Sequence, residues 1–189
     1  LEIHVPNWTA DSIVTDHTVY QSLSFPGAQH DQPPGAPDIP SLVIPVGVPA
    51  EGQISVNIAI TQSQLLESIQ LAPAPRSEVE NQDVSWSYTP DPEIYKRSEF
   101  APHALINRPD TRRLRSIHYV PIRVYLLQYN PNTQALRRYN RITLTITFPQ
   151  TVQSAKPAAY DEQLDNLLIN YDQARLWAAT PQQRLQKAQ

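Results

Sequence analysis

Apolar and polar residues alternate along several stretches of the chain, which is the pattern of half-buried β-strands. In residues 54–60 (ISVNIAI) the apolar positions fall on one face, and residues 116–129 predict one long strand. Residues 136–148 are predicted as the returning strand, in which residues 142–148 alternate apolar residues with threonines, and the Asn-Pro sequence in residues 129–133 supplies turn geometry. The sequence therefore predicts a β-hairpin here. Its basic residues are predicted to form a solvated face: Arg137, Arg138 and Arg141.

Nineteen prolines and only four glycines constrain how the strands connect. Proline has no backbone N–H, so it stops helices and central strands and favours many short elements. Residues 17–25 and 41–48 also predict strands, and Pro45 makes the second an edge strand or a bulge. Pro121 predicts an unpaired side in the long strand. Residues 26–40 are predicted to form a rigid surface loop, and the composition favours an all-β domain.

The character of the chain changes after residue 149. Residues 150–159 read as a linker, and Asp161 is a suitable N-cap for a helix over residues 161–178. This helix carries apolar residues at helical spacing: Leu164, Leu167, Leu168, Tyr171 and Ala174. We predict one domain over residues 1–149, and a linker, docking helix and tail over residues 150–189 that lead to a downstream domain. Because a lone short helix is marginal in water, it must dock on the sheets or on something beyond this chain.

Composition excludes several classes of function. The chain has 189 residues, 40% of them hydrophobic and 17% charged, with a net charge of −3. This balance gives no electrostatic case for binding nucleic acid or an anionic membrane, and no apolar run has the length of a membrane span. Without cysteine there is no thiol nucleophile, zinc-thiolate site or disulfide. The start at Leu1 suggests a removed upstream segment, and the Asn7-Trp8-Thr9 sequon is compatible with secretion.

The chain shows little of the chemistry of an enzyme. Its five histidines have no metal-ligand spacing, and no glycine-rich phosphate loop or Gly-x-Ser-x-Gly motif is present. We therefore predict no catalytic residue, no metal site and no cofactor in this chain.

The densest polar feature is residues 107–115 (NRPDTRRLR), immediately before the long strand. It holds four arginines: Arg108, Arg112, Arg113 and Arg115. One interpretation is a solvated basic loop that Asp110 partly balances. The other is a cationic probe that enters an acidic pocket on a partner through the bidentate reach of guanidinium. The residue types alone leave both interpretations open.

A series of short motifs, taken in order, resembles the N-terminal propeptide domain of gingipain-type cysteine peptidases. The likeness covers nearly the whole chain, and the order and spacing of the motifs carry it. The motifs are Phe25-Pro26-Gly27, residues 35–40 (GAPDIP), Ile44-Pro45, residues 90–95, a strand led by Arg115 into Gln128-Tyr129-Asn130-Pro131, Leu136, Tyr139 and the alternating strand after it, and Asn170-Tyr171 with Trp177.

The resemblance implies a β-sandwich or jelly-roll-like domain that acts as intramolecular chaperone and inhibitor of a secreted, caspase-like cysteine peptidase domain. The nucleophile would belong to that partner. In the arginine-specific members a basic side chain of the propeptide can occupy the specificity pocket; here Arg112 and Arg113 are the first choices, with Arg108 and Arg115 behind them. Arg184 and Lys187 in the tail are the expected maturation cleavage positions, since exposed polar tails are easily cut.

Two alternatives use the same sequence differently. The chain would serve as a β-sandwich binding or structural module, carbohydrate-binding or part of a cell-surface assembly, if Tyr119, Tyr125 and Trp86 formed an exposed aromatic platform. The opposing interpretation packs these aromatics under the proline-punctuated residues 73–92. As a further alternative, the domain persists after maturation as a scaffold held by the helix over residues 161–178. The noncatalytic propeptide is the leading hypothesis.

Overall fold

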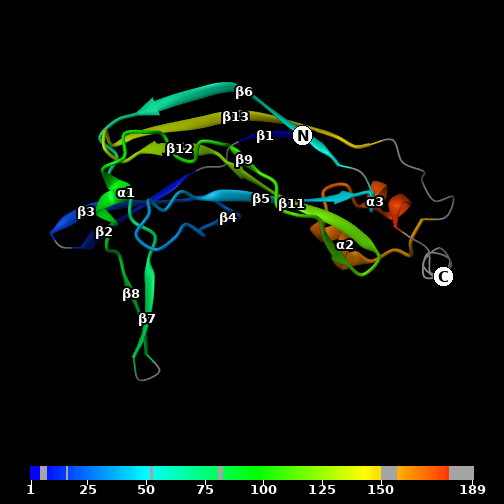
Figure 1. Cartoon of the computed structure of the whole chain (residues 1–189), viewed down its shortest axis with the longest axis horizontal. Helices are drawn as coiled ribbons and strands as arrows, with labels where there is room; N and C mark the ends of the chain where they lie inside the picture. The colour runs from blue at the N-terminus through cyan, green and yellow to red at the C-terminus, as the bar shows by residue number, and fades with distance from the viewer. Residues whose placement is uncertain (5–7, 16, 52, 81–82, 150–156, 179–189) are drawn as a thin grey trace.

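Most of the regular secondary structure of the protein is β-strand (Figure 1). The computed structural model describes residues 1–4, 8–15, 17–51, 53–80, 83–149 and 157–178. The strands are β1 (Glu2–His4), β2 (Thr9–Thr15), β3 (Thr18–Ser24), β4 (Ala28–Gln29), β5 (Ser41–Val48), β6 (Ser55–Leu66), β7 (Arg76–Glu80), β8 (Asp83–Ser87), β9 (Ile106–Asn107), β10 (Arg112–Leu114), β11 (Ile117–Tyr125), β12 (Leu127–Asn130) and β13 (Ala135–Thr147). The helices are α1 (Pro92–Tyr95), α2 (Glu162–Leu167) and α3 (Tyr171–Trp177).

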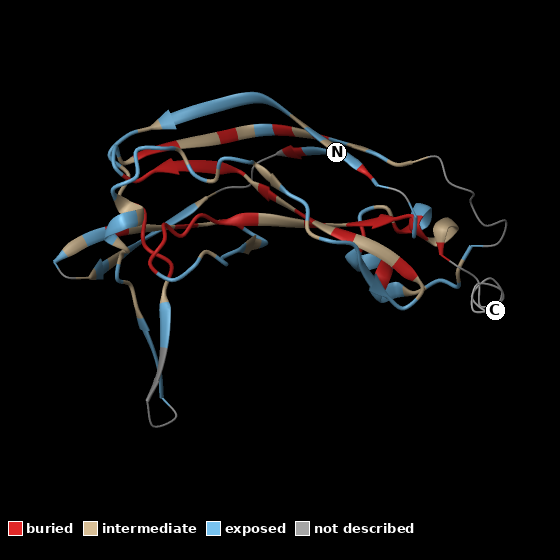
Figure 2. Cartoon of the chain, viewed as in Figure 1, coloured by how far each residue is buried: buried red, intermediate tan, exposed pale blue. Residues whose placement is uncertain are grey.

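Two antiparallel sheets enclose the main core. In one, β13 pairs with β6 along one edge and with β1 and β12 along the other. In the other, β11 pairs with β5, β9 and β10, and β5 also pairs with β4. Buried positions recur along the strands of both sheets (Figure 2). The two sheets contribute to one core cluster, which includes Ile44, Val46, Val120, Ile122, Ile142 and Leu144. The predicted mainly β, sandwich-like fold is confirmed.

The three other predicted strands are also present, as β3, β5 and β6. β6 is twelve residues long, and its sequence SVNIAITQSQLL contains neither a charged residue nor a proline. Among the described residues β6 pairs only with β13, so the outer edge of β6 is open.

Pro45 and Pro121 lie directly opposite each other in the β5–β11 pair. Neither residue has an N–H to donate, so the two can only form a pair that exchanges no hydrogen bonds. On its other edge, β11 pairs with β10 through residues 117–119 and with β9 through residues 123–124. No described strand therefore faces Pro121 on that side, as the proline predicted.

The prediction of one strand over residues 116–129 is wrong. β11 ends at Tyr125, and β12 starts at Leu127 in the other sheet. Leu126 between them is completely buried, and its carbonyl accepts a hydrogen bond from the Tyr139 N–H at 3.0 Å. The alternation is interrupted at this corner, since Leu126 and Leu127 are both apolar and both buried, but the continuing apolar run hides the change of sheet.

The predicted hairpin around residues 129–133 is confirmed as β12–β13. Asn130 fixes the turn, since its Oδ1 accepts a hydrogen bond from the Thr133 N–H at 3.2 Å. The predicted solvated face of arginines is correct only for Arg141, which is exposed. Arg137 and Arg138 are half-buried, with their guanidinium groups over aromatic rings.

The predicted surface loop at residues 26–40 is wrong for its last six residues, since residues 35–40 are all buried. Residues 71–74 run beside them and exchange backbone hydrogen bonds with them. The Asp38 N–H donates to the Ala72 carbonyl at 2.8 Å, and the Ala74 N–H donates to the Ala36 carbonyl at 2.7 Å. Two proline-rich segments thus satisfy each other's backbone groups, which allows both to be buried.

The C-terminal segment forms two short helices instead of the single predicted helix. Asp161 caps α2 as predicted, accepting hydrogen bonds from the N–H groups of residues 163 and 164. The break before α3 is fixed by Asn170, whose side-chain amide both accepts from the Gly47 N–H (2.7 Å) and donates to the Gly47 carbonyl (2.9 Å). An added Cβ at Gly47 would overlap the Cβ of Ala174, so glycine is required where α3 crosses β5.

The two helices pack against the outer face of the β5–β11 sheet. Their buried side chains form a cluster with Ile117: Leu164, Leu168, Tyr171, Ala174 and Ala178. Leu167, predicted to lie on the same apolar face, is exposed because the helix ends there.

Candidate functional site

The predicted arginine cluster lies on the β10–β11 hairpin, at one end of the five-stranded sheet. β10 pairs with residues 117–119, and the turn between the strands contains Arg115 in the left-handed region, at φ 56°. All four arginines of the cluster are exposed. The structure therefore brings Arg112, Arg113 and Arg115 together on one hairpin and places Arg108 in the segment that leads to it.

The strand register determines the face on which each arginine lies. Arg112 pairs with Tyr119, and Arg113 pairs with His118. Residues directly opposite in an antiparallel pair share a face of the sheet. Tyr119 packs against the cluster formed by α2 and α3, so Arg112 lies on the helix side of the sheet and Arg113 on the other.

Arg115 is tied to the start of α2. Its guanidinium forms an ion pair with Asp161 and donates a hydrogen bond to Gln163 Oε1 at 2.9 Å. Because Asp161 is also the N-cap of α2, a single carboxylate joins the hairpin turn to the helix. These contacts hold the Arg115 side chain against its own domain.

Arg113 is also engaged within the hairpin. Its Nε donates to the Arg115 carbonyl at 2.9 Å, which closes the turn. Across the strand pair, partial burial lowers the pKa of His118, and the positive charge of Arg113 lowers it further.

Arg108 is held at the base of the hairpin, where its Nη1 donates to the Ile54 carbonyl at 2.8 Å. A cavity of about 170 Å³ opens beside this contact. It is lined by Val48, Gln53, Ile54, Arg108, Pro109, Asp110, Thr111 and Val120.

Arg112 differs from the other three arginines. Its guanidinium has no hydrogen-bond or ion-pair partner among the residues that the structure describes, and it is exposed. The four arginines that the sequence grouped together thus separate into three that bond within the domain and one, Arg112, that has no such contact among the described residues.

The aromatic platform proposed as an alternative is not formed. Tyr119 packs with the helices, whereas Tyr125 packs with a different cluster that contains Leu71 and Tyr129. Trp86 lies on the separate β7–β8 hairpin and is exposed. No single face therefore presents the three rings.

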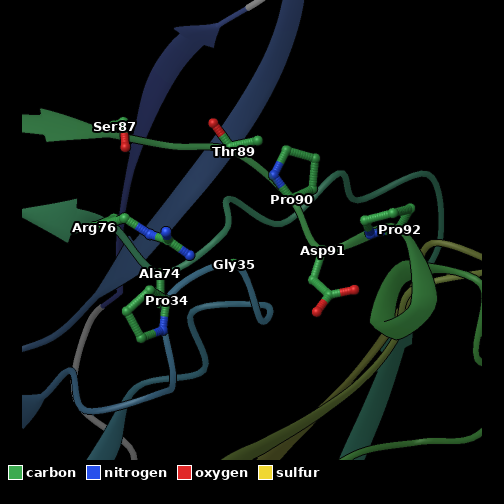
Figure 3. Close-up of a pocket in the computed structure, with 9 residues that line it drawn as sticks. All are labelled: Pro34, Gly35, Ala74, Arg76, Ser87, Thr89, Pro90, Asp91 and Pro92. Atoms are coloured by element: carbon green, nitrogen blue, oxygen red, sulfur yellow. The ribbon is translucent and has the colours of Figure 1, made fainter.

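A second region of interest, which sequence reasoning missed, is the base of the β7–β8 hairpin. A cavity of about 400 Å³ lies there, with Arg76 and Asp91 on opposite sides of it (Figure 3). It is lined by Pro34, Gly35, Ala74, Arg76, Ser87, Thr89, Pro90, Asp91 and Pro92. The missed signal was the alternation of Val84, Trp86 and Tyr88, which is a strand pattern.

A hydrogen-bonded chain of Ser24, His30 and Asp38 was also missed. His30 Nδ1 lies 2.8 Å from Asp38 Oδ2, and His30 Nε2 lies 3.3 Å from Ser24 Oγ. This is the order of a hydrolase triad, but Ser24 and His30 line neither cavity described above. Asp38 is buried, so we interpret these three hydrogen-bonded side chains as a structural contact that fixes residues 26–40, the proline-rich loop, on β3.

Within the described residues, no group of three or more histidine, aspartate or glutamate side chains is placed to hold a metal ion. The described part of the chain also contains no helix of the length and apolarity that a membrane span requires.

The family of the chain follows from comparison with known proteins. The family model Propeptide_C25 matches residues 1–174. The chain belongs to the Propeptide_C25 family. A Propeptide_C25 domain is the noncatalytic part of a gingipain-like cysteine peptidase precursor, which accounts for the missing catalytic residues.

Solved structures share the fold of this Propeptide_C25 domain. One is titled "Complex of Porphyromonas gingivalis RgpB pro- and mature domains" (TM-score 0.69, 17% identity, covering 90% of this chain and 91% of that chain). Another comes from a study of zymogenic latency of gingipain K from Porphyromonas gingivalis (TM-score 0.60, 20% identity, covering 74% of this chain and 81% of that chain). The comparison with curated proteins gave no match.

Two of the residues predicted from the Propeptide_C25 resemblance cannot be placed. Arg184 and Lys187 lie in residues 179–189, outside the described residues, and their cleavage stays a prediction.

Proposed function

We propose that this domain inhibits, and assists the folding of, the caspase-like cysteine peptidase domain of its own precursor, and that Arg112 is the side chain that enters the specificity pocket of the peptidase. Membership of Propeptide_C25 supports the inhibitory role. The choice of Arg112 rests on one observation: among the four arginines of the cluster, only its guanidinium has no partner within the described chain.

The position of Arg112 suits this role for two physical reasons. It lies on a strand that is paired to the main sheet, so its backbone is fixed before the partner arrives. A guanidinium also presents a planar set of donors to a carboxylate, which favours bidentate pairing in an acidic pocket. Arg113 and Arg115 support the turn that presents Arg112.

The experiment is an inhibition assay with the purified domain and its cognate mature peptidase. We expect Arg112→Ala to weaken inhibition by 10-fold or more, because removing one member of a buried charge pair costs about 2–5 kcal/mol. Arg141→Ala is the matched control: it removes the same charge from an exposed pair with Glu2 and should change inhibition less than about twofold. Failure of the wild-type domain to inhibit at micromolar concentration would contradict the proposal.

Arg112→Lys tests the geometry of the same contact. Lysine keeps the charge and loses the planar fork, so we expect an intermediate inhibition constant if the pocket pairs with the guanidinium in a bidentate manner. Equal inhibition by the arginine and lysine forms would show that the pocket recognises only the positive charge of residue 112.

We further propose that the domain is exported with its peptidase and released by cleavage in the C-terminal tail, with residues 1–149 as the inhibitory body and residues 150–189 as the connection to the catalytic domain. Intact-mass analysis of the natural protein tests this. A mature species that still contains residues 1–149 in covalent linkage would instead indicate a retained scaffold.

A further inference from the structure

The β7–β8 hairpin is isolated from the two main sheets. Its strands pair only with each other among the described residues, and in Figure 1 the hairpin stands off the body of the molecule. A two-stranded ribbon is marginally stable in water by itself. Its persistence as a projecting element therefore depends on how its base is held and on what its faces contact.

The base of the hairpin is held by the proline-rich loop. The Gly35 N–H donates to the Ala74 carbonyl at 2.9 Å, just before β7 begins, and the Asp91 N–H donates to the Gly35 carbonyl at 2.9 Å, just after β8 ends. One buried residue thus bonds both legs of the hairpin (Figure 3). This double attachment, between prolines with fixed φ, sets the direction in which the hairpin projects.

One face of the hairpin is apolar and exposed. Val84 and Trp86 are two residues apart on β8, so their side chains share a face. They are 57% and 58% exposed. Asp83 and Ser85, which alternate with them, are polar and lie on the opposite face. A hairpin with both faces in water would gain no stability from having one apolar face. Exposed aromatic residues on a fixed element are instead typical of interface anchors.

The hairpin projects on the side of the molecule where Arg112 is presented. In Figure 1 the hairpin and helix α2 both extend below the β5–β11 sheet, at opposite ends of it. Arg112 shares the helix side of that sheet through its pairing with Tyr119. A partner that receives Arg112 at one end therefore has the β7–β8 hairpin beside it at the other.

We propose that Val84 and Trp86 form a second contact with the mature peptidase domain, in which the indole of Trp86 fills an apolar recess on that domain. This inference rests on the proposed function, which supplies the partner, and a solved relative of the same fold is a complex of pro- and mature domains. Arg112 then determines which pocket is read, and Trp86 provides a large share of the affinity.

The test measures binding separately from inhibition. The domain is titrated against the cognate mature peptidase with its nucleophile replaced, by calorimetry or surface plasmon resonance. We expect Trp86→Ala to raise Kd about 10-fold or more, as for a buried aromatic anchor, and Trp86→Phe to raise it less. Val84→Ser should raise Kd moderately. Val19→Ser, an equally exposed valine on β3 (56%), is the control and should leave Kd unchanged.

Tryptophan fluorescence gives a second readout. The chain has three tryptophans, and Trp8 and Trp177 are already half-buried. Burial of the exposed Trp86 should shift the emission to shorter wavelength on complex formation, and Trp86→Phe should abolish that shift. Thermal unfolding of each variant checks that the domain is folded, and the exposed position of Trp86 makes a large loss of stability unexpected.

The outcomes separate the two proposals. If Arg112→Ala weakens inhibition while Trp86→Ala binds with wild-type Kd, the proposed function stands and the hairpin contact is wrong. If the wild-type domain binds the mature peptidase without any emission shift, the contact is likewise wrong. If the wild-type domain neither binds nor inhibits, both proposals fail.

Discussion

The β10–β11 and β7–β8 hairpins differ in how they are supported. β10–β11 continues the five-stranded sheet, and Arg115 joins its turn to α2 through Asp161. β7–β8 belongs to neither main sheet and is bonded to the body through Gly35 at its base. The first can hold a single side chain in a fixed place, which suits recognition of a pocket. The second offers an exposed apolar surface on a projecting hairpin, which suits strong binding to a partner more than discrimination between partners.

This difference predicts that the two hairpins fail separately. Substitutions around α2 and α3 should disturb presentation of Arg112 and leave Trp86 in place, whereas substitutions in the proline-rich loop should do the reverse. The following changes test that separation, beginning with the largest expected effect on the free energy of unfolding.

Gly47→Ala should have the largest effect, about 3 kcal/mol, because the added Cβ overlaps Ala174 and the backbone of β5 cannot move away. It should lift α3 from the sheet and weaken inhibition. Chemical denaturation measures the loss of stability. Ala174→Gly in the same chain removes the overlapping atom and should restore part of the stability, and a double mutant no better than Gly47→Ala would contradict this account.

Gly35→Ala should cost about 2 kcal/mol, because Gly35 has φ +86° and an added Cβ would lie 3.2 Å from the Thr89 carbonyl. It should loosen the base of β7–β8 and weaken binding without altering the Arg112 contact. Gly27→Ala is the matched control: Gly27 has φ +81°, and an added Cβ would meet only Leu42 Cδ1 at 3.9 Å, an ordinary van der Waals distance, so this change reports the backbone strain without a close contact. Equal losses at the two positions would show that the Thr89 contact is unimportant.

Asp161→Ala should cost about 1.5 kcal/mol, since it removes both the cap of α2 and the ion pair to Arg115. Asp161→Asn separates the two contributions, because asparagine still caps the helix but carries no charge. We expect the asparagine form to retain most of the stability in thermal unfolding and to lose some inhibition. Inhibition unaffected by either change would mean that the ion pair does not position the hairpin.

The smallest effect is a pH dependence at the β10–β11 hairpin. Burial, assisted by Arg113, lowers the pKa of His118 in the folded domain, so the unfolded chain binds its proton more readily. Well above the ordinary histidine pKa, His118 has no effect on the free energy of unfolding. As the pH falls from that pKa towards the lower pKa of the folded state, the free energy of unfolding decreases. His118→Gln should flatten the part of the stability profile that lies below the ordinary histidine pKa of about 6.5. If the substitution leaves the stability–pH profile unchanged, the pH dependence comes from another titratable group.

The order of neighbouring residues predicted those features that depend on neighbouring residues alone. The alternation of residues 54–60 and 136–148 gave strands, Asp161 gave a helix start, and the arginine cluster gave the position of the candidate site. The partners of those arginines could not be predicted, because Arg115 meets Asp161 across 46 positions of sequence and Arg108 meets the backbone of Ile54. The selection of Arg112, as the arginine of the cluster without a partner in the described part of the chain, depends on those long-range contacts.

The wrong predictions have the same cause. Leu126 and Leu127 are adjacent apolar residues where the chain changes sheet, but residues 116–129 were predicted as one strand because the apolar run continues and both sheets bury the same kinds of residue. The helix break at Asn170 follows from its two hydrogen bonds to Gly47, which lies 123 positions earlier. The prediction that Trp86 packs under residues 73–92 is wrong because those residues form its own projecting hairpin.

The open edge of β6 has a consequence for the proposed release of the domain from its precursor. Natural edge strands are commonly protected by charges, prolines or bulges against strand addition from other molecules. β6 has twelve residues with neither charge nor proline, and its pairing with β13 is irregular only opposite Ile60 to Ser63, which leaves a regular stretch over residues 55–60. If the domain is released as proposed, this edge offers a template for self-association that grows with concentration and limits its solubility. Ala59→Lys, at an exposed position on this edge strand, should raise the concentration at which light scattering first increases.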